Sequence, residues 1–329
     1  MHEGILSAIG DTPLVKLTRV FKGIHFNLFA KLEALNPGGS MKDRPALTIL
    51  RHGLETGAIN PDTVVIESSS GNMGIGLAQA CAYFGLRFIC VVDPKVNRQN
   101  VNLLKIYGAE VDMVTSVHPD TGEYLQSRID RVKHLLTTIE NSFWPDQYSN
   151  LHNPRAHHRT MAELVAVLGR EIDYLFCATS TCGTIRGCAE YVRDHGMRTK
   201  IIAVDAVGSV IFGAEKKTRL IPGHGAAVRP KLYRSDLAER CVLVSDLDCV
   251  IGCRRLVREE AILAGGSSGG MIMAIEQLLP DIPRDAVCVA IFPDRGERYL
   301  DTIYSDDWVA EHLGQIPILA QPALEVQYA

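Results

Sequence analysis

A lysine follows a glycine-rich segment near the start of the chain. Residues 36–43 read Asn-Pro-Gly-Gly-Ser-Met-Lys-Asp, so Lys42 comes shortly after Ser40. Glycines let the backbone approach a ligand closely, and Ser40 is of a residue type that caps helices. An amine at the positively polarised N-terminus of a helix is pushed toward its neutral, nucleophilic form. The pattern predicts a lysine that bonds covalently to a carbonyl compound. The alternative is an ordinary solvated lysine, which is the usual meaning of a lone Ser-x-Lys.

Two later loops favour the chemical interpretation. Residues 67–76 follow a β-branched apolar run and lead into a helical stretch, and residues 179–184 do the same after a second strand-like run. Such loops present hydroxyl and backbone N–H groups to an anion at a helix N-terminus. Each loop alone could be a plain connection between a strand and a helix. Together with Lys42, they predict a cofactor that carries both an aldehyde and a phosphate.

With these motifs in place, the sequence resembles the fold-type II pyridoxal-phosphate enzymes of the cysteine synthase and cystathionine β-synthase group. The resemblance runs from about Ile5 to about Tyr304 and includes residues 9–15 and 265–269. It implies an α/β fold like that of the tryptophan synthase β chain, with two lobes that each hold a mostly parallel sheet flanked by helices. It also implies pyridoxal 5'-phosphate as cofactor, and we expect a homodimer.

The resemblance assigns roles to individual residues. Lys42 falls on the catalytic Schiff-base lysine, Asn72 on the partner of the cofactor's 3-hydroxyl, and Ser267 on the partner of its pyridine nitrogen. The residues that match the phosphate loop are Ser180, Thr181, Cys182, Gly183 and Thr184, with Cys182 in place of the family's usual glycine. The residues expected to bind the substrate carboxylate are Ser69, Ser70, Gly71 and Met73, with Gln147 as a further member.

The serine at position 267 indicates the type of reaction. A hydroxyl cannot protonate the pyridine nitrogen as an aspartate would, so the ring is a moderate electron sink. Elimination and β-replacement are then favoured over transamination. Lys42 is the expected general base for the Cα proton.

Weaker segments favour one branch of the family. Residues 36–45, 92–95, 204–213 and 292–300 together look most like the enzymes that join O-phospho-L-serine to the amino group of L-glutamate. Those enzymes give N-(2-amino-2-carboxyethyl)-L-glutamate and phosphate, on the way to 2,3-diaminopropionate and the siderophore staphyloferrin B. One alternative is a cysteine synthase that uses sulfide with O-acetylserine or O-phosphoserine. A non-catalytic binding homologue is a third interpretation, which Lys42, Asn72 and Ser267 argue against.

Glutamate and phosphoserine bring more anionic groups than sulfide does, so the site needs more cationic donors. We expect Arg128 to bind a substrate carboxylate or phosphate, with Tyr148 and Ser180 beside it as hydrogen-bond partners. The alternative is that Arg128 is a solvated helix residue. His224 could face the same cleft and is a weaker candidate.

Composition agrees with an enzyme of small molecules. The chain has 329 residues, of which 47% are hydrophobic and 22% charged, enough for a large core in two lobes. A net charge of −4 argues against a nucleic-acid partner. The nine cysteines are scattered, as in reduced cytosolic proteins, and Cys249 and Cys253 lack the second pair that a metal site needs. No apolar run reaches the ~20 residues of a membrane span, so we expect a cytoplasmic protein.

Strand-like runs alternate with helical stretches, which predicts parallel sheets covered by helices. The expected strands are residues 28–32, 64–67, 87–92, 110–114, 174–178, 200–205, 241–245 and 286–292. We expect a small mobile lobe at 40–150, a large cofactor-binding lobe made of 1–39 and 151–315, and a crossing between them at 141–159. Residues 316–329 are expected to be a loosely held tail.

Overall fold

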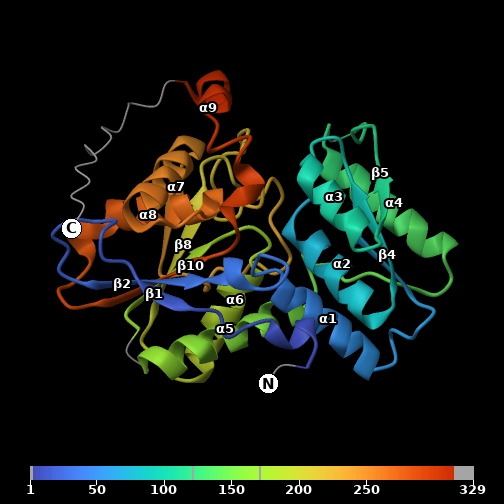
Figure 1. The fold of residues 1–329 in the computed structure, drawn as a ribbon, viewed down its shortest axis with the longest axis horizontal. Helices are drawn as coiled ribbons and strands as arrows, with labels where there is room; N and C mark the ends of the chain where they lie inside the picture. Colours follow the sequence, from blue (N-terminus) through green and yellow to red (C-terminus); the bar gives the residue numbers. More distant parts are fainter. Residues whose placement is uncertain (1–2, 121, 170–171, 315–329) are drawn as a thin grey trace, which may run out of the picture.

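The computed structural model describes residues 3–120, 122–169 and 172–314, and Figure 1 shows their arrangement. Its strands form two separate sheets. The larger sheet has six strands in the order β1-β2-β10-β7-β8-β9. These strands are β1 (Leu14–Lys16), β2 (Asn27–Leu32), β10 (Val287–Phe292), β7 (Tyr174–Ala178), β8 (Lys200–Ala206) and β9 (Arg240–Val244). All neighbours in this sheet run parallel except β1 and β2, which are antiparallel.

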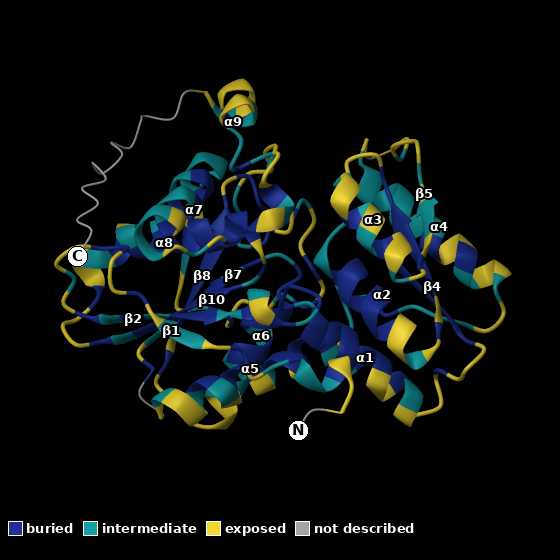
Figure 2. Ribbon diagram, viewed as in Figure 1, coloured by how far each residue is buried: buried dark blue, intermediate teal, exposed yellow. Residues whose placement is uncertain are grey.

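The smaller sheet has four strands in the order β5-β4-β3-β6, and all of its neighbours are parallel. The strands are β3 (Val64–Ser68), β4 (Arg87–Val92), β5 (Glu110–Met113) and β6 (Ser142–Phe143). All five residues of β3 are buried, which explains why this strand is an unbroken apolar run that ends in polar groups. Figure 2 shows that the strands of both sheets lie mainly in the buried interior.

Helices cover the two sheets. Those before and within the smaller unit are α1 (Asp43–Glu55), α2 (Asn72–Phe84), α3 (Arg98–Ile106) and α4 (Tyr124–Thr138). Those of the larger unit are α5 (His152–Leu168), α6 (Gly183–Asp194), α7 (Asp246–Glu260), α8 (Gly266–Leu278) and α9 (Asp306–Leu313). Helix α1 packs on both α2 and α5, so it joins the two units at the bottom of Figure 1.

The eight predicted strands are confirmed, with ends that differ by no more than one residue. Two strands were missed, β1 and β6, because they have only three and two residues and carry too little periodicity to be recognised. The α/β class and the mostly parallel sheets are confirmed as well. In the part of the chain that the structure describes, no helix has both the length and the apolar character needed to cross a membrane.

The lobe boundaries themselves stay a prediction, and the strands give the positions of the two sheets. The four strands of the smaller sheet lie between residues 64 and 143, and those of the larger sheet lie outside 40–150. The segment 141–159 contains β6 and the start of α5, so it does connect the two sheets. The mobility of the smaller lobe stays a prediction. The expected tail at 316–329 lies outside the described residues.

Candidate active site

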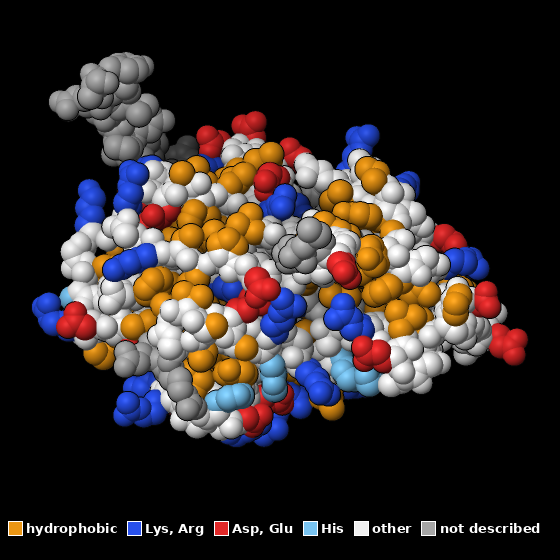
Figure 3. Space-filling model, turned by 60° about the horizontal axis from the view of Figure 1, so that its bottom comes forward, with side chains coloured by type: hydrophobic (Ala, Val, Ile, Leu, Met, Phe, Trp, Pro, Cys, Tyr) orange, Lys and Arg blue, Asp and Glu red, His pale blue; other side chains and the backbone are white. Residues whose placement is uncertain are grey.

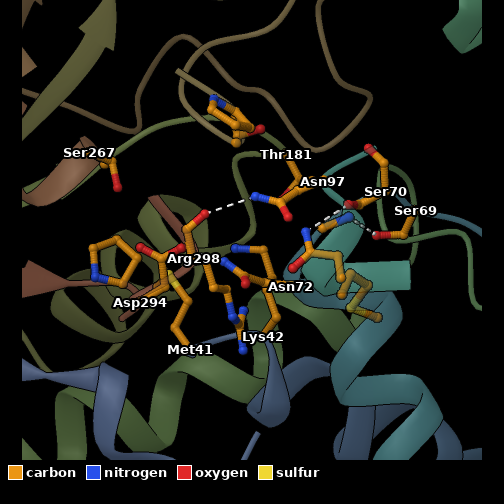
Figure 4. Close-up of a pocket in the computed structure, with 18 of the residues that line it drawn as sticks. Met41, Lys42, Ser69, Ser70, Asn72, Asn97, Thr181, Ser267, Asp294 and Arg298 are labelled. Atoms are coloured by element: carbon orange, nitrogen blue, oxygen red, sulfur yellow. Dashed lines mark hydrogen bonds between the residues drawn. The ribbon is translucent and has the colours of Figure 1, made fainter. Parts of the chain in front are cut away.

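A cavity of about 570 Å³ opens between the two units. Its walls come largely from loops that follow parallel strands, which is where open α/β sheets bind their ligands. Apart from the weaker candidate His224, every site residue expected from the sequence lines it: Lys42, Ser69, Ser70, Gly71, Asn72, Met73, Arg128, Gln147, Tyr148, Ser180, Thr181, Cys182, Gly183, Thr184 and Ser267. Figure 4 shows several of them around the cavity. Tertiary structure therefore brings all these residues together, while the role of each stays a prediction.

Lys42 is the N-cap residue of α1, which begins at Asp43. The expectation that Ser40 caps this helix is wrong, because Ser40 lies two residues too early. Its hydroxyl instead accepts a hydrogen bond from the backbone N–H of Lys42 at 3.2 Å. The carboxylate of Asp43 turns back to the backbone N–H of Gly38 at 2.5 Å. These two hydrogen bonds fix the conformation of residues 38–43, the loop that carries Lys42.

The lysine loop is also bound to a distant segment after β10. The backbone N–H of Met41 donates to the carbonyl of Pro293 at 2.8 Å, and Arg298 Nη2 donates to the carbonyl of Gly38 at 2.5 Å. The position of Lys42 is therefore fixed by the larger sheet as well as by α1.

The amine of Lys42 is prepared as a nucleophile mainly by burial. Burial lowers the pKa of Lys42, and the nearby carboxylates of Asp294 and Glu33 only partly oppose this effect. The expected direction of the shift is confirmed, but the leading cause is desolvation and not the helix N-terminus. Among the described residues, no side chain forms a hydrogen bond or ion pair with the Lys42 amine. The group is free to react with a ligand in the cavity.

A buried ion network lies behind the lysine helix. Arg44 Nε pairs with Glu33 at 2.6 Å, and Arg44 Nη2 pairs with Glu163 of α5 at 2.7 Å. Lys31 of β2 pairs with the same Glu163 carboxylate at 2.6 Å. The side chains of Glu33 and Arg44 are 0% and 3% exposed. The network ties the start of α1 to β2 and α5.

Asn72, the first residue of α2, is held by a buried carboxylate. Its Nδ2 donates to Asp294 at 2.7 Å, and the hydroxyl of Tyr299 donates to the same oxygen at 2.6 Å. Asp294 is 3% exposed, and its charge acts on the amine of Lys42. Because the amide nitrogen is occupied, Asn72 keeps its amide oxygen for a partner in the cavity, which suits a hydroxyl donor.

The loop from Ser180 to Thr184 ends at the N-terminus of α6. Cys182 has φ 65°, a left-handed conformation that glycine adopts without strain, which agrees with the glycine that the resemblance leads us to expect there. The hydroxyl of Thr181 accepts from the Gly183 N–H at 3.3 Å. Backbone N–H groups in the first turn of a helix lack partners within the helix, so this end of α6 can bind a phosphate.

Two residues that the sequence argument missed support this loop. Asn153 donates to the carbonyl of Gln147 at 2.7 Å and to the Thr181 hydroxyl at 3.4 Å. His157 lies on α5 and is buried, and its Nε2 is 3.3 Å from the Thr184 hydroxyl. Both belong to the polar segment 141–159, whose unusual content of Asn and His was the available signal.

Ser267 lies in the first turn of α8 and is 8% exposed. Its hydroxyl makes no hydrogen bond to any described residue, so it is available to a ligand nitrogen. The free amine of Lys42, the fixed amide of Asn72, the N-terminus of α6 and the Ser267 hydroxyl together provide the partners for an aldehyde, a ring hydroxyl, a phosphate and a ring nitrogen. This donor set fits pyridoxal 5'-phosphate.

The substrate side of the cavity is formed by the loop before α2 and by α4. Arg128 of α4 pairs through Nε with Asp93 at 3.1 Å and donates from Nη1 to the Ser70 hydroxyl at 3.4 Å. Its side chain is 13% exposed, so the alternative of a solvated helix residue is wrong. Burial raises the pKa of Tyr148, although Arg128 lowers it in part, and the phenol is therefore protonated at neutral pH.

One weaker expectation is contradicted by the packing. His224 does not face the cavity: it is fully buried, its Nε2 lies 3.1 Å from the carbonyl of Val204, and burial lowers its pKa to about 4. Cys249 and Cys253 are buried in α7, and within the described ranges no three His, Cys, Asp or Glu side chains gather in a possible metal site.

Comparisons with known proteins agree with this geometry. The family described as "Pyridoxal-phosphate dependent enzyme" matches residues 5–294. A protein of Ralstonia nicotianae, N-(2-amino-2-carboxyethyl)-L-glutamate synthase, is 44% identical, with 98% of this chain and 97% of the relative covered.

Solved structures show the same fold. An O-acetylserine-dependent cystathionine β-synthase from Helicobacter pylori has a TM-score of 0.85 and 31% identity over 93% of this chain and 99% of its own. A hydrogen sulfide-producing enzyme from Fusobacterium nucleatum has a TM-score of 0.85 and 29% identity, covering 91% and 98%. The chain belongs to the family of pyridoxal-phosphate-dependent enzymes, with a cysteine synthase-like fold and pyridoxal phosphate as its cofactor.

Proposed function

We propose that this enzyme joins O-phospho-L-serine and L-glutamate to give N-(2-amino-2-carboxyethyl)-L-glutamate and phosphate, as a step toward 2,3-diaminopropionate and siderophores. The observation that carries the proposal is the relative of that name, which is 44% identical over nearly the whole of both chains. The cysteine synthase interpretation remains the alternative, because the H. pylori enzyme of this fold, a cystathionine β-synthase, depends on O-acetylserine, which is also a donor in that alternative.

The charges of the cavity support anionic substrates. Besides the reactive Lys42, three cationic side chains line it, those of Lys95, Arg128 and Arg298, whereas Asp294 is the only carboxylate among its described lining residues. Phosphoserine and glutamate each carry an anionic group beyond their amino acid end, and sulfide carries none. An excess of cations is therefore more useful to the proposed substrates than to a sulfide acceptor.

The residues divide the work of the reaction. When bound, pyridoxal phosphate supplies the electron sink that favours loss of the Cα proton and of the β-substituent. Lys42 Nζ, with its lowered pKa, takes the Cα proton of phosphoserine and returns a proton to the same carbon after glutamate has added. Ser69, Ser70 and Gln147 orient the substrate carboxylate, and Ser267 holds the ring nitrogen without protonating it. Closure of the smaller lobe would exclude water.

The decisive experiment offers the enzyme O-phospho-L-serine with either L-glutamate or sulfide and identifies the products by mass. The proposal expects the glutamate adduct as the main product, and a faster release of phosphate from phosphoserine than of acetate from O-acetylserine. Faster formation of cysteine from sulfide would move the function to cysteine synthase.

We also propose a cytoplasmic homodimer. All nine cysteines are free, and eight of them are buried, as expected for a reducing compartment. The face that carries the N-terminus, turned forward in Figure 3, shows several groups of hydrophobic side chains, and Ile5 near that end is 49% exposed. A mass measurement by light scattering that gave a monomer at micromolar concentration would contradict the dimer.

A further inference from the structure

The cationic side chains of the cavity differ in what they already bind. The guanidinium of Arg298 donates to the Gly38 carbonyl, and that of Arg128 pairs with Asp93. Lys95 is exposed, and its ammonium contacts only the ring of Tyr124, with 5.7 Å from Nζ to the ring centroid. Apart from the reactive Lys42, Lys95 is therefore the described cation of the cavity whose charged group is bonded to no protein oxygen.

One buried carboxylate organises two of these cations. Asp93 is 5% exposed and follows β4 directly. Its Oδ1 accepts from the backbone N–H of Lys95 at 2.8 Å, and its Oδ2 pairs with Arg128 Nε at 3.1 Å. The side chain of Asp93 thus fixes both the turn that carries Lys95 and the guanidinium of Arg128.

Helix α4 places the ammonium of Lys95 and the guanidinium of Arg128 on the same side of the helix. Tyr124 and Arg128 are four residues apart on this helix, so they lie on one face. Because the Lys95 ammonium lies over the Tyr124 ring, it is held next to that face and close to Arg128.

The turn that carries Lys95 is also fixed on its other side. Asn97 Nδ2 donates to the backbone carbonyl of Arg298 at 2.9 Å, the contact drawn as a dashed line in Figure 4. Lys95 therefore stands on a turn that is bonded to both units at the rim of the cavity, where a substrate enters.

We propose that Asp93 holds Lys95 and Arg128 as a two-cation site that binds the distal anionic group of each substrate in turn. This assignment rests on the proposed function, in which the two groups are the phosphate of O-phospho-L-serine and then the side-chain carboxylate of L-glutamate. The leaving phosphate must depart before glutamate can react at the same carbon, so one site can serve both. Two adjacent cations suit phosphate and carboxylate oxygens, and Arg128 keeps Nη2 for a ligand while Nε pairs with Asp93 and Nη1 donates to Ser70.

The test of the site uses inorganic phosphate as the probe and isothermal titration calorimetry on the holoenzyme. Lys95→Ala should weaken phosphate binding about fivefold, the upper range for a cation near the surface, and Lys95→Arg should restore most of it. Raising the ionic strength should weaken binding in the wild type more than in Lys95→Ala. The matched control is Lys105→Ala, which removes an exposed lysine of α3 outside the cavity and should change nothing.

Kinetics separate this proposal from the proposed function. Lys95→Ala should raise the KM for phosphoserine and the KM for glutamate, with a much smaller change in kcat. A rise in only one of the two values, or phosphate binding as tight as in the wild type, would overturn the shared site. If phosphate binding depended on Lys95 while the wild type made no glutamate adduct, the proposed function would fail and the anion site would stand.

Discussion

The two ends of the cavity are built in different ways. The cofactor end consists of loops at helix N-termini, where Lys42, Asn72 and Ser267 stand at or near the first residues of α1, α2 and α8. The rim consists of long charged side chains, Lys95 and Arg128, that are placed by the carboxylate of Asp93. The difference suggests that the chemistry is fixed by main-chain geometry, while substrate choice depends on a few side chains.

Removing the amine of Lys42 should abolish catalysis at the cofactor end of the cavity. Lys42→Ala loses the covalent anchor and the base for the Cα proton, so turnover should fall by about three orders of magnitude or more. The fold should persist, and cofactor should still bind through the α6 loop, with the visible absorption of the cofactor as the readout. Lys105→Ala is the control. Substantial remaining β-replacement activity would show that another group acts as the base.

Disrupting the ion network behind Lys42 should strongly lower the stability of the fold. Glu163→Gln leaves Arg44 and Lys31 without their shared carboxylate, which should cost about 3 to 5 kcal/mol in the free energy of unfolding. Glu190→Gln, which removes a more exposed partner of Arg186 on α6, is the control and should cost about 1 kcal/mol or less.

The carboxylate of Glu163 should also make the stability of the fold depend on pH. Burial would raise the pKa of Glu163, but the hydrogen bonds from Arg44 and Lys31 outweigh it and lower the pKa from 4.5 to about 2. Its stabilisation is therefore present above about pH 4.5 and is lost as the pH falls toward 2. Chemical unfolding between these values should show a steeper loss of stability in the wild type than in Glu163→Gln. Parallel curves would mean that Glu163 is not the group responsible.

At the rim, Arg128→Ala should lower kcat/KM for both phosphoserine and glutamate by an amount equal to about 2 to 5 kcal/mol, since it removes a largely buried cation. Arg131→Ala, three residues further along α4, removes a more exposed partner of Asp112 outside the cavity and should have little effect. An equal loss in both variants would point to damage to α4 and not to a lost substrate contact.

The smallest expected effect concerns the backbone of the phosphate loop. At position 182 the Gly variant should be more stable than the Ala variant by about 1 kcal/mol, because alanine keeps the left-handed strain at φ 65°. At position 188, buried within the regular part of α6, the order should reverse. Thermal or chemical unfolding of the four variants measures both differences. The same order at both positions would show that Cys182 is not strained.

The sequence by itself determined eight of the strands, the cofactor and many of the residues that line the cavity. Each of these depends on a local pattern, a buried strand followed by a polar loop and a helix, and such a junction always presents its loop at the carboxyl edge of a parallel sheet. Local motifs also carried the resemblance that implied pyridoxal phosphate.

Only the tertiary structure decided how these residues are supported. Asn72 and Asp294 are 222 positions apart, and Arg44 and Glu163 are 119 apart, so no local pattern links them. The same is true of Arg128, whose burial against Asp93 could not be read from an ordinary amphipathic helix. Charged side chains look alike in a sequence whether they are solvated or paired, and only packing across the two sheets distinguishes a surface charge from a binding group.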